Sequence, residues 1–286
     1  MSTSELPHHA SPTPWQRAAW PLAVGLSPLL FAQGKWVRRQ VPKLPPAPGP
    51  LEGHEPGARP LRILGVGDST VVGVGVDDAS YGLIPQFARA VGEKLGRGAY
   101  WRSVGESGAT SKDILARFVP AVLEQPADIV VVSLGANDAK DLKPLGATTE
   151  RFERLLNIVH DGHRDAVVIV SSLPAFSLFP TLPQPLRSIL YAHSQAIERS
   201  LRPMIESHPL AIMSPPPPKY HDTFFAQDGF HPGVDGYRDW AHFAVDDALE
   251  RGVLSEIVRR SAPAGSTAGA AAGHPFSLGK LSSNIA

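Results

Sequence analysis

The stretch Leu61-Arg-Ile-Leu-Gly-Val-Gly-Asp-Ser-Thr70 decides the fold of this chain. Its first seven residues form a short apolar run that ends in glycine, which is typical of a buried strand. Asp68 and Ser69 follow directly, so both are expected at the carboxyl end of that strand. In open sheets of parallel strands, ligands bind beyond the carboxyl ends. Residues 61–67 therefore predict a strand that places Ser69 at a ligand-binding edge.

Strands and helices alternate from this stretch up to residue 252. The β-branched runs 128–134 and 166–171 predict two further buried strands, and shorter runs predict strands at 101–104 and 210–213. Helices are expected at 81–95, 111–123, 149–163, 185–207 and 234–252, the fourth with a break near Pro203. The alternation predicts an α/β domain in which helices cover both faces of a parallel sheet.

The composition excludes several classes of function. The 286 residues include no cysteine, which excludes disulfides, thiolate metal sites and a cysteine nucleophile. The 27 basic and 27 acidic residues cancel, so the chain has no overall charge that would attract nucleic acid. No nucleic-acid partner is therefore expected.

Three regions are expected along the chain. Residues 1–60 hold an apolar segment and a proline-rich linker, residues 61–255 form the α/β domain, and residues 256–286 form a disordered tail. The prolines of 42–60 predict an extended connection. The tail is rich in Ala, Gly and Ser without periodicity, which predicts disorder.

The apolar stretch 18–32 has three interpretations. It is about 15 residues long, short of the roughly 20 that span a bilayer, and prolines interrupt it. It can be a helix that packs on the domain or lies on a membrane surface, an uncleaved anchor, or a signal peptide. Basic residues follow the stretch, whereas a secretory signal has them before it. A cytoplasmic or membrane-associated location is favoured over secretion, and peripheral membrane contact through residues 18–36 is a hypothesis.

Two further segments bring polar groups to the edge where Ser69 is expected. In Gly135-Ala-Asn137-Asp138, after the strand at 128–134, the Asn amide can donate a hydrogen bond to an oxyanion, or it can cap a helix or form an Asx-turn. In Gly105-Glu-Ser-Gly108, a glycine backbone can approach a ligand and offer its N–H. The alternative for this second segment is an ordinary turn before a helix.

Asp228-Gly-Phe-His231 precedes the last expected helix. An Asp three residues before a His can accept from the imidazole Nδ1–H, which leaves Nε2 free to take a proton from a serine. A helix cap beside a surface histidine is the alternative. Together with Ser69, Asn137 and the glycine N–H groups, this pair supplies the nucleophile, base, orienting group and oxyanion donors that acyl transfer needs.

These motifs resemble the blocks of the SGNH (GDSL-type) hydrolases. Gly67-Asp68-Ser69, continued here by Thr70-Val71, resembles the first block of the family. Ser107-Gly108 resembles the second block. The third matches Gly135-Ala-Asn137-Asp138 and the fifth matches Asp228-Gly-Phe-His231. Their order and spacing agree with the family over roughly residues 61–250.

The resemblance implies a flavodoxin-like three-layer α/β/α fold with a five-stranded parallel sheet, and hydrolysis of carboxylic esters without metal or other cofactor. It implies Ser69 as nucleophile, His231 as base and Asp228 as the residue that orients His231. The oxyanion hole would be formed by the backbone N–H groups of Ser69 and Gly108 and the side chain of Asn137. Many relatives carry Asn shortly before the second-block glycine, where this chain has Ser103-Val-Gly105. Gly105 therefore stays an alternative donor to the favoured Gly108.

The segment after the fourth strand, residues 173–186, is rich in apolar residues. Four of its side chains are expected either to wall an acyl-chain pocket or to pack the loop down: Phe176, Leu178, Phe179 and Leu182.

No carbohydrate platform of aromatic residues is evident, which favours lipid-like or simple acyl esters as small-molecule substrates. The alternatives are a glycan O-acetylesterase and a non-catalytic binding module on the same fold. A binding module would be expected to lose at least one of Ser69, Asn137 and His231.

Overall fold

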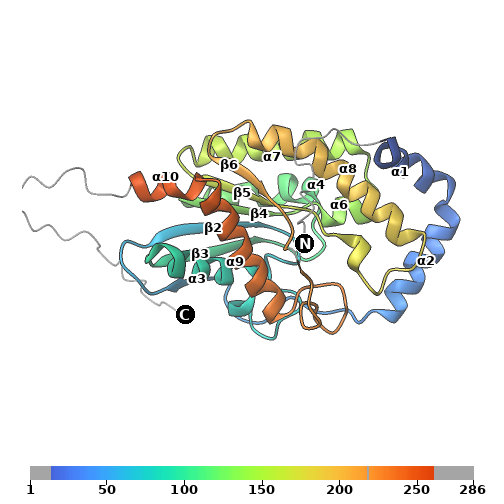
Figure 1. Cartoon of the computed structure of the whole chain (residues 1–286), viewed down its shortest axis with the longest axis horizontal. Helices are drawn as coiled ribbons and strands as arrows, with labels where there is room; N and C mark the ends of the chain where they lie inside the picture. Colours follow the sequence, from blue (N-terminus) through green and yellow to red (C-terminus); the bar gives the residue numbers. More distant parts are fainter. Residues whose placement is uncertain (1–13, 218, 261–286) are drawn as a thin grey trace, which may run out of the picture.

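Six strands form one sheet in the order β1-β3-β2-β4-β5-β6 in the computed structural model, which describes residues 14–217 and 219–260 (Figure 1). The strands are β1 (Glu52–Glu55), β2 (Leu61–Gly67), β3 (Ala99–Gly105), β4 (Ile129–Ser133), β5 (Val167–Ser171) and β6 (Ala211–Ser214). β1 pairs antiparallel with β3, and the other four pairs are parallel. The predicted parallel α/β core is confirmed, and the sheet has six strands where five were expected.

The additional strand β1 lies at the edge of the sheet, inside the segment 42–60 expected as a linker. Its four residues carry no apolar run, so the sequence pattern contained no signal for it. Gly53 pairs with Trp101 of β3, and a Cβ at this position would lie 2.6 Å from the indole ring. Glycine at this position therefore lets β1 pair closely against Trp101, and the fold begins before residue 61.

Helices cover both faces of the sheet. They are α1 (Pro14–Gly25), α2 (Ser27–Gln40), α3 (Leu83–Leu95), α4 (Ser111–Asp113), α5 (Val119–Leu123), α6 (Ala136–Lys140), α7 (Leu145–Gly162), α8 (Leu186–Glu206), α9 (Val234–Glu250) and α10 (Val253–Arg260). Short turns of helix lie at Ala79–Tyr81 (η1), Ile114–Phe118 (η2) and Phe176–Leu178 (η3).

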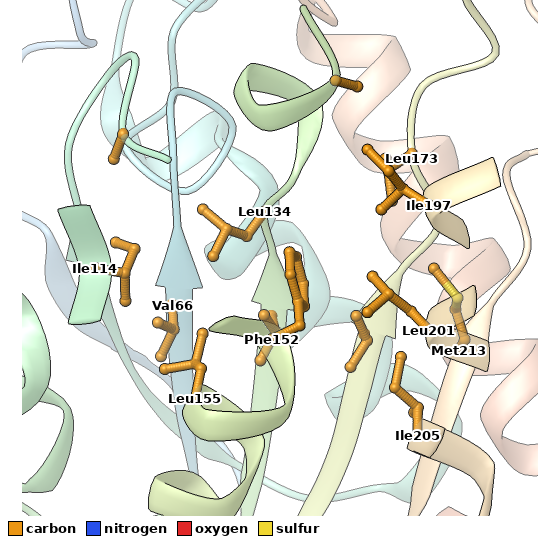
Figure 2. Close-up of a cluster of buried hydrophobic side chains, with 14 of the residues drawn as sticks. Val66, Ile114, Leu134, Phe152, Leu155, Leu173, Ile197, Leu201, Ile205 and Met213 are labelled. Atoms are coloured by element: carbon orange, nitrogen blue, oxygen red, sulfur yellow. The ribbon is translucent and has the colours of Figure 1, made fainter. Parts of the chain in front are cut away.

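Alternate residues of the parallel strands β2 to β6 enter two hydrophobic cores. Val130 and Val132 of β4 point to the core under α7 and α8, which Figure 2 shows around Phe152 and Leu201. Ile129 and Val131 of the same strand point to the opposite core, under α3, α9 and α10. Strands buried on both faces read as continuous apolar runs, which is why the sequence predicts them clearly. The result is the expected three-layer α/β/α arrangement.

Two of the expected helices that contain proline differ from the prediction, in opposite ways. Over 111–123 the chain forms α4, a wide π-type turn at η2 and then α5. Pro120 has no N–H for the carbonyl four residues earlier, and the regular α-helical hydrogen bonding is interrupted just before it. The break expected in α8 near Pro203 is absent, since Pro203 lies in the last turn and Leu201 and Ile205 anchor it in the core.

The N-terminal stretch forms two helices, α1 and α2, where one apolar segment over 18–32 was expected. Ala23 and Leu30 are buried against the core that α8 covers. The Gln33 side chain donates to the Gln184 carbonyl at 2.5 Å and accepts from the Leu186 N–H at 3.1 Å. These contacts make α1 and α2 part of the fold. Within residues 14–217 and 219–260, no helix has the length and apolarity that crossing a bilayer requires.

The C-terminal end of the domain differs slightly from the expected boundary at residue 255. Helix α10 runs to Arg260, and its Leu254 and Ile257 are buried in the core under α9. Residues 256–260 therefore belong to a helix and not to the expected tail. The rest of that tail, residues 261–286, lies outside the described residues.

Candidate active site

The polar segments singled out by the sequence meet at the point where the chain changes direction in the sheet. The chain passes from β2 to β3 on one side, and then returns to β4 on the other side of β2. The helix after β2, α3, covers one face, and the helix after β4, α7, covers the other. The loops that begin at Asp68 and at Leu134 therefore diverge and leave a crevice between them.

Ser69, His231 and Asp228 form a hydrogen-bonded chain in this crevice. His231 Nε2 lies 3.1 Å from Ser69 Oγ, and His231 Nδ1 lies 2.6 Å from Asp228 Oδ2. Ser69 and Asp228 are buried, whereas a fifth of the His231 side chain is exposed. The arrangement lets His231 accept a proton from Ser69 while Asp228 holds the imidazole ring.

Asp228 is held by more than the histidine. Its Oδ1 accepts the backbone N–H groups of Phe230 and His231, both at 2.9 Å. Burial alone would raise the pKa of Asp228, but the hydrogen bonds from the His231 ring and these two backbone groups outweigh burial and hold the pKa below its ordinary value. Asp228 is therefore a carboxylate that fixes both the turn and the ring of His231.

Gly75 packs closely against the backbone next to His231. Gly75 has φ of +107°, which favours glycine over every other residue. A Cβ at this position would collide with the carbonyl oxygen of Pro232 and lie 3.2 Å from His231 Cβ. Gly75 thus permits the close approach of two loops that brings His231 to Ser69, and only the tertiary contact reveals this requirement.

Asn137, at the start of α6, has its amide held by three partners. Its Nδ2 donates to the Ala109 carbonyl at 3.0 Å and to Asp68 Oδ2 at 3.2 Å. Lys140 Nζ donates to its Oδ1 at 2.8 Å, which assigns the oxygen to the outer side and the NH₂ group to the site. The longer bond, to Asp68, is the weaker of the two that Nδ2 makes. An oxyanion in the site could accept the Asn137 N–H that now donates to Asp68, either together with Asp68 or in its place.

Gly108 and Gly105 occupy different positions, which separates the two candidate donors. Gly105 is the last residue of β3 and pairs with Gly67 in the ladder. Gly108 lies in the following loop with φ of +85° and open space around its Cβ position. Neither Gly108 N–H nor Ser69 N–H donates to another residue in the described part of the chain. This geometry favours Gly108.

The loop that carries Gly108 is tied to the third block by a buried carboxylate. Asp138 is fully buried, and it accepts from Ser111 N–H at 2.9 Å and from Ser111 Oγ at 2.7 Å. Because Asp138 follows Asn137 directly, one short helix positions both the amide and the loop opposite it.

The carboxyl group of Asp68 lies in the protein interior beside the site. Burial raises the pKa of Asp68 to about 6, although hydrogen bonds from Thr70 and the positive charge of Lys140 oppose the shift. Thr70 is in turn bonded to Ser133 at the end of β4, with 2.7 Å between the two hydroxyl oxygens. Asp68 thus connects the first block to the third, because it accepts a hydrogen bond from the Asn137 amide.

A cavity with a mostly apolar lining opens directly beside Ser69 and His231. Its apolar wall comes from the loops after β5 and β6 and from α9, and includes Leu173, Pro174, Phe179, Pro216, Pro217, Tyr220, Phe224, Phe225, Phe230 and Trp240. The rings pack on one another: Phe179 lies 5.1 Å from both Phe225 and Phe230, between centroids, and Tyr220 stacks on Phe224 at 4.2 Å. The cavity suits an apolar group attached to an atom that Ser69 can reach.

Of the four side chains expected to wall this cavity, only Phe179 lines it. Phe176 and Leu182 are buried in the core below, so they pack the loop down, which was the alternative interpretation. Leu178 is 57% exposed and faces away. The correction has a simple cause: the segment turns at η3, so successive residues point in different directions.

The sequence reasoning missed the larger part of the wall, which comes from residues 216–217 and 220–232. A run of prolines begins this segment, and prolines by themselves indicate only a connection between elements. It leaves the carboxyl end of β6, at the same sheet edge as the other site segments, and it is followed by four aromatic residues, Tyr220, Phe224, Phe225 and Phe230. This combination of position and composition was the available signal.

Comparison with known proteins decides the family. The model of the GDSL-like lipase/acylhydrolase family matches residues 66–238, more than half of the chain. The chain belongs to this family. The expected resemblance is thereby confirmed, and the protein is a carboxylic-ester hydrolase of the GDSL type.

Individual relatives agree with this assignment. A GDSL-like esterase of Mycobacterium tuberculosis, Rv1075c, is 26% identical over 248 residues, which cover 79% of this chain and 78% of the relative. The lipase Lip_vut3 from a goat rumen metagenome is 18% identical with a TM-score of 0.53, and covers 65% of this chain and 96% of its own. A family 3 carbohydrate esterase of Clostridium thermocellum is 16% identical with a TM-score of 0.55, and covers 71% of this chain and 98% of its own. The two structures establish the shared fold.

Proposed function

We propose that this GDSL hydrolase cleaves esters of apolar acyl groups through an acyl-enzyme on Ser69. The observation that carries the proposal is the Asp228–His231–Ser69 chain beside an apolar cavity. Ser69 Oγ attacks the ester carbonyl, and its proton passes to His231 Nε2. The imidazolium, stabilised by Asp228, then gives that proton to the leaving alcohol. Water repeats the two steps and releases the acid.

The oxyanion of each tetrahedral intermediate would be bound by the N–H groups of Ser69 and Gly108 and by the amide of Asn137. The two backbone donors have no other described partner, and the amide is oriented by Lys140. Removal of one such donor typically raises the barrier by about 2.7–4 kcal/mol. The donor is most effective in the transition state, because the charge develops only there.

Asn137→Ala is accordingly expected to lower kcat about 10²- to 10³-fold with little change in KM. Steady-state kinetics on p-nitrophenyl butyrate measures both constants. Lys140→Met is a second, milder variant. It keeps the Asn137 amide and removes the ammonium group that orients it, so a smaller loss of kcat is expected. An effect of Asn137→Ala confined to KM would contradict the oxyanion role and make Asn137 a substrate-binding residue.

The acyl group is proposed to be apolar because aromatic rings and prolines line the cavity beside Ser69. Each buried methylene contributes about 0.8 kcal/mol, or roughly fourfold in kcat/KM, until the cavity is filled. A glycan O-acetylesterase would instead favour acetyl over longer chains. The carbohydrate esterase among the structural relatives establishes the fold alone, so the cavity is the observation that favours longer acyl groups.

Activity on p-nitrophenyl esters from acetyl to long chains tests this acyl preference. We expect kcat/KM to rise from acetate to hexanoate, and Phe225→Ala to lower the hexanoate/acetate ratio about tenfold, since that ring would contact the chain but not the reacting carbonyl. Leu178→Ala is the matched control, because this exposed side chain belongs to the neighbouring loop but not to the cavity. A wild-type optimum at acetate would contradict the proposal in favour of deacetylation.

A further inference from the structure

The outer surface of α1 and α2 concentrates exposed apolar residues. Among the described residues, seven of the thirteen large hydrophobic side chains that are exposed lie between Trp15 and Trp36. Phe31 is 67% exposed and Trp36 is 52% exposed. We call this surface the α1–α2 outer face; it consists of Trp15, Leu22, Val24, Leu26, Leu29, Phe31 and Trp36. Such a concentration of exposed apolar side chains on two adjacent helices indicates an interaction site.

The same two helices already have a buried side, so the outer face is not simply their packing surface. Ala23 and Leu30 enter the core, and Gln33 is bonded to the segment before α8. Residues at this helical spacing account for how α1 and α2 are held to the domain. These contacts attach the outer face to the domain, and no residue in the described part of the chain covers it.

The charge around the outer face has one sign. Between Pro14 and Leu51 the sequence has five Lys and Arg residues and no Asp or Glu, although the whole chain is neutral. Lys35, Arg38 and Arg39 follow the apolar residues on the exposed side of α2 and form no ion pair with a carboxylate in the part of the chain that the structure describes. A surface that combines exposed Trp, Phe and Leu with basic residues is typical of helices that lie in the boundary of an anionic membrane.

The position of the outer face connects it to the active site. Figure 1 shows α1 and α2 at the end of the molecule where the loop after β5 emerges, and the Gln33–Gln184 bond joins α2 to that loop. The same loop contributes Phe179 to the cavity beside Ser69. A membrane at this face would therefore lie at the same end of the molecule as the catalytic edge of the sheet.

We propose that the α1–α2 outer face binds the surface of an anionic lipid bilayer, with its apolar side chains among the acyl chains and its basic side chains at the headgroups. A second copy of the chain is the weaker candidate, because two such faces in contact would bring their basic residues together. The binding is independent of the ester hydrolysis proposed above, but it would bring the cavity near amphiphilic esters.

Co-sedimentation with vesicles tests the inference on the full chain. The wild-type protein is expected to sediment with vesicles of phosphatidylcholine that contain phosphatidylglycerol, and far less with phosphatidylcholine alone. Lys35→Gln/Arg38→Gln/Arg39→Gln is expected to lower the partition coefficient about 100-fold, since each basic residue near the surface contributes about fivefold. Phe31→Ser/Trp36→Ser is expected to lower it at least tenfold on both kinds of vesicle.

Controls keep the result specific. Tyr100→Ser/Leu123→Ser removes exposed apolar side chains from elsewhere on the molecule and is expected to bind as the wild type does. All variants are expected to hydrolyse soluble p-nitrophenyl acetate at the wild-type rate, which separates membrane binding from catalysis. Equal binding by the wild type and by Phe31→Ser/Trp36→Ser would overturn the proposal. So would a wild-type dimer that this double variant dissociates and that never sediments with vesicles, because the face would then join two copies.

Discussion

Replacement of Ser69 by alanine is expected to lower kcat about 10⁶-fold while leaving the fold intact. The hydroxyl is the atom that would form the acyl-enzyme, and no other hydroxyl lies within hydrogen-bond distance of His231 Nε2 among the described residues. The residual rate would come from the oxyanion donors and from substrate binding, which remain in the variant. The measurement is single-turnover and steady-state hydrolysis of p-nitrophenyl butyrate.

A covalent label makes this first prediction specific. A fluorophosphonate should modify Ser69 in the wild type, and peptide mapping should find no label in Ser69→Ala. Thermal unfolding of the variant should match the wild type, since the lost hydroxyl makes only the bond to His231. Label on another serine, or a variant that keeps more than about one per cent of the activity, would remove Ser69 from the mechanism and would favour a binding module or another nucleophile.

Asp228→Asn is expected to lower kcat about 10⁴-fold. Asp228 Oδ1 accepts two backbone N–H groups, so the carboxamide oxygen of the variant should keep that place. Its NH₂ group would then face His231 Nδ1, which could only accept. The proton of the neutral ring would move to Nε2, and Nε2 could no longer take the proton of Ser69. The loss arises from the wrong tautomer and not from a missing side chain.

Asp235→Asn is the matched control for this second prediction. Asp235 is an acidic residue in the first turn of α9 that accepts from Thr223 at 2.8 Å and has no contact with the site. It should leave kcat unchanged. If Asp228→Asn lowered thermal stability but reduced kcat less than tenfold, Asp228 would be a structural residue of the turn, and His231 would act without an orienting carboxylate.

The sequence by itself determined the strands of the parallel core and the segments that carry the chemistry. Strands such as β4 are buried at every position and apolar up to their last residue, so their pattern is strong and local. The Asp228–His231 pair is also local, because three residues in one turn are enough to bring the carboxylate to Nδ1. Ser69 and Asn137 could be placed at one edge because they follow neighbouring parallel strands.

Only the tertiary structure decided the features that depend on contacts between distant segments. The edge strand β1 forms by pairing with β3, where Gly53 leaves room for the ring of Trp101. Gly108 is favoured over Gly105 because Gly105 is used in the sheet. The cavity wall combines Phe179 with residues 216–217 and 220–232 and with α9, which come together only when the loops after β5 and β6 pack on each other. Such contacts produce no periodic pattern in the sequence, because they depend on how side chains from distant segments fit together and become buried.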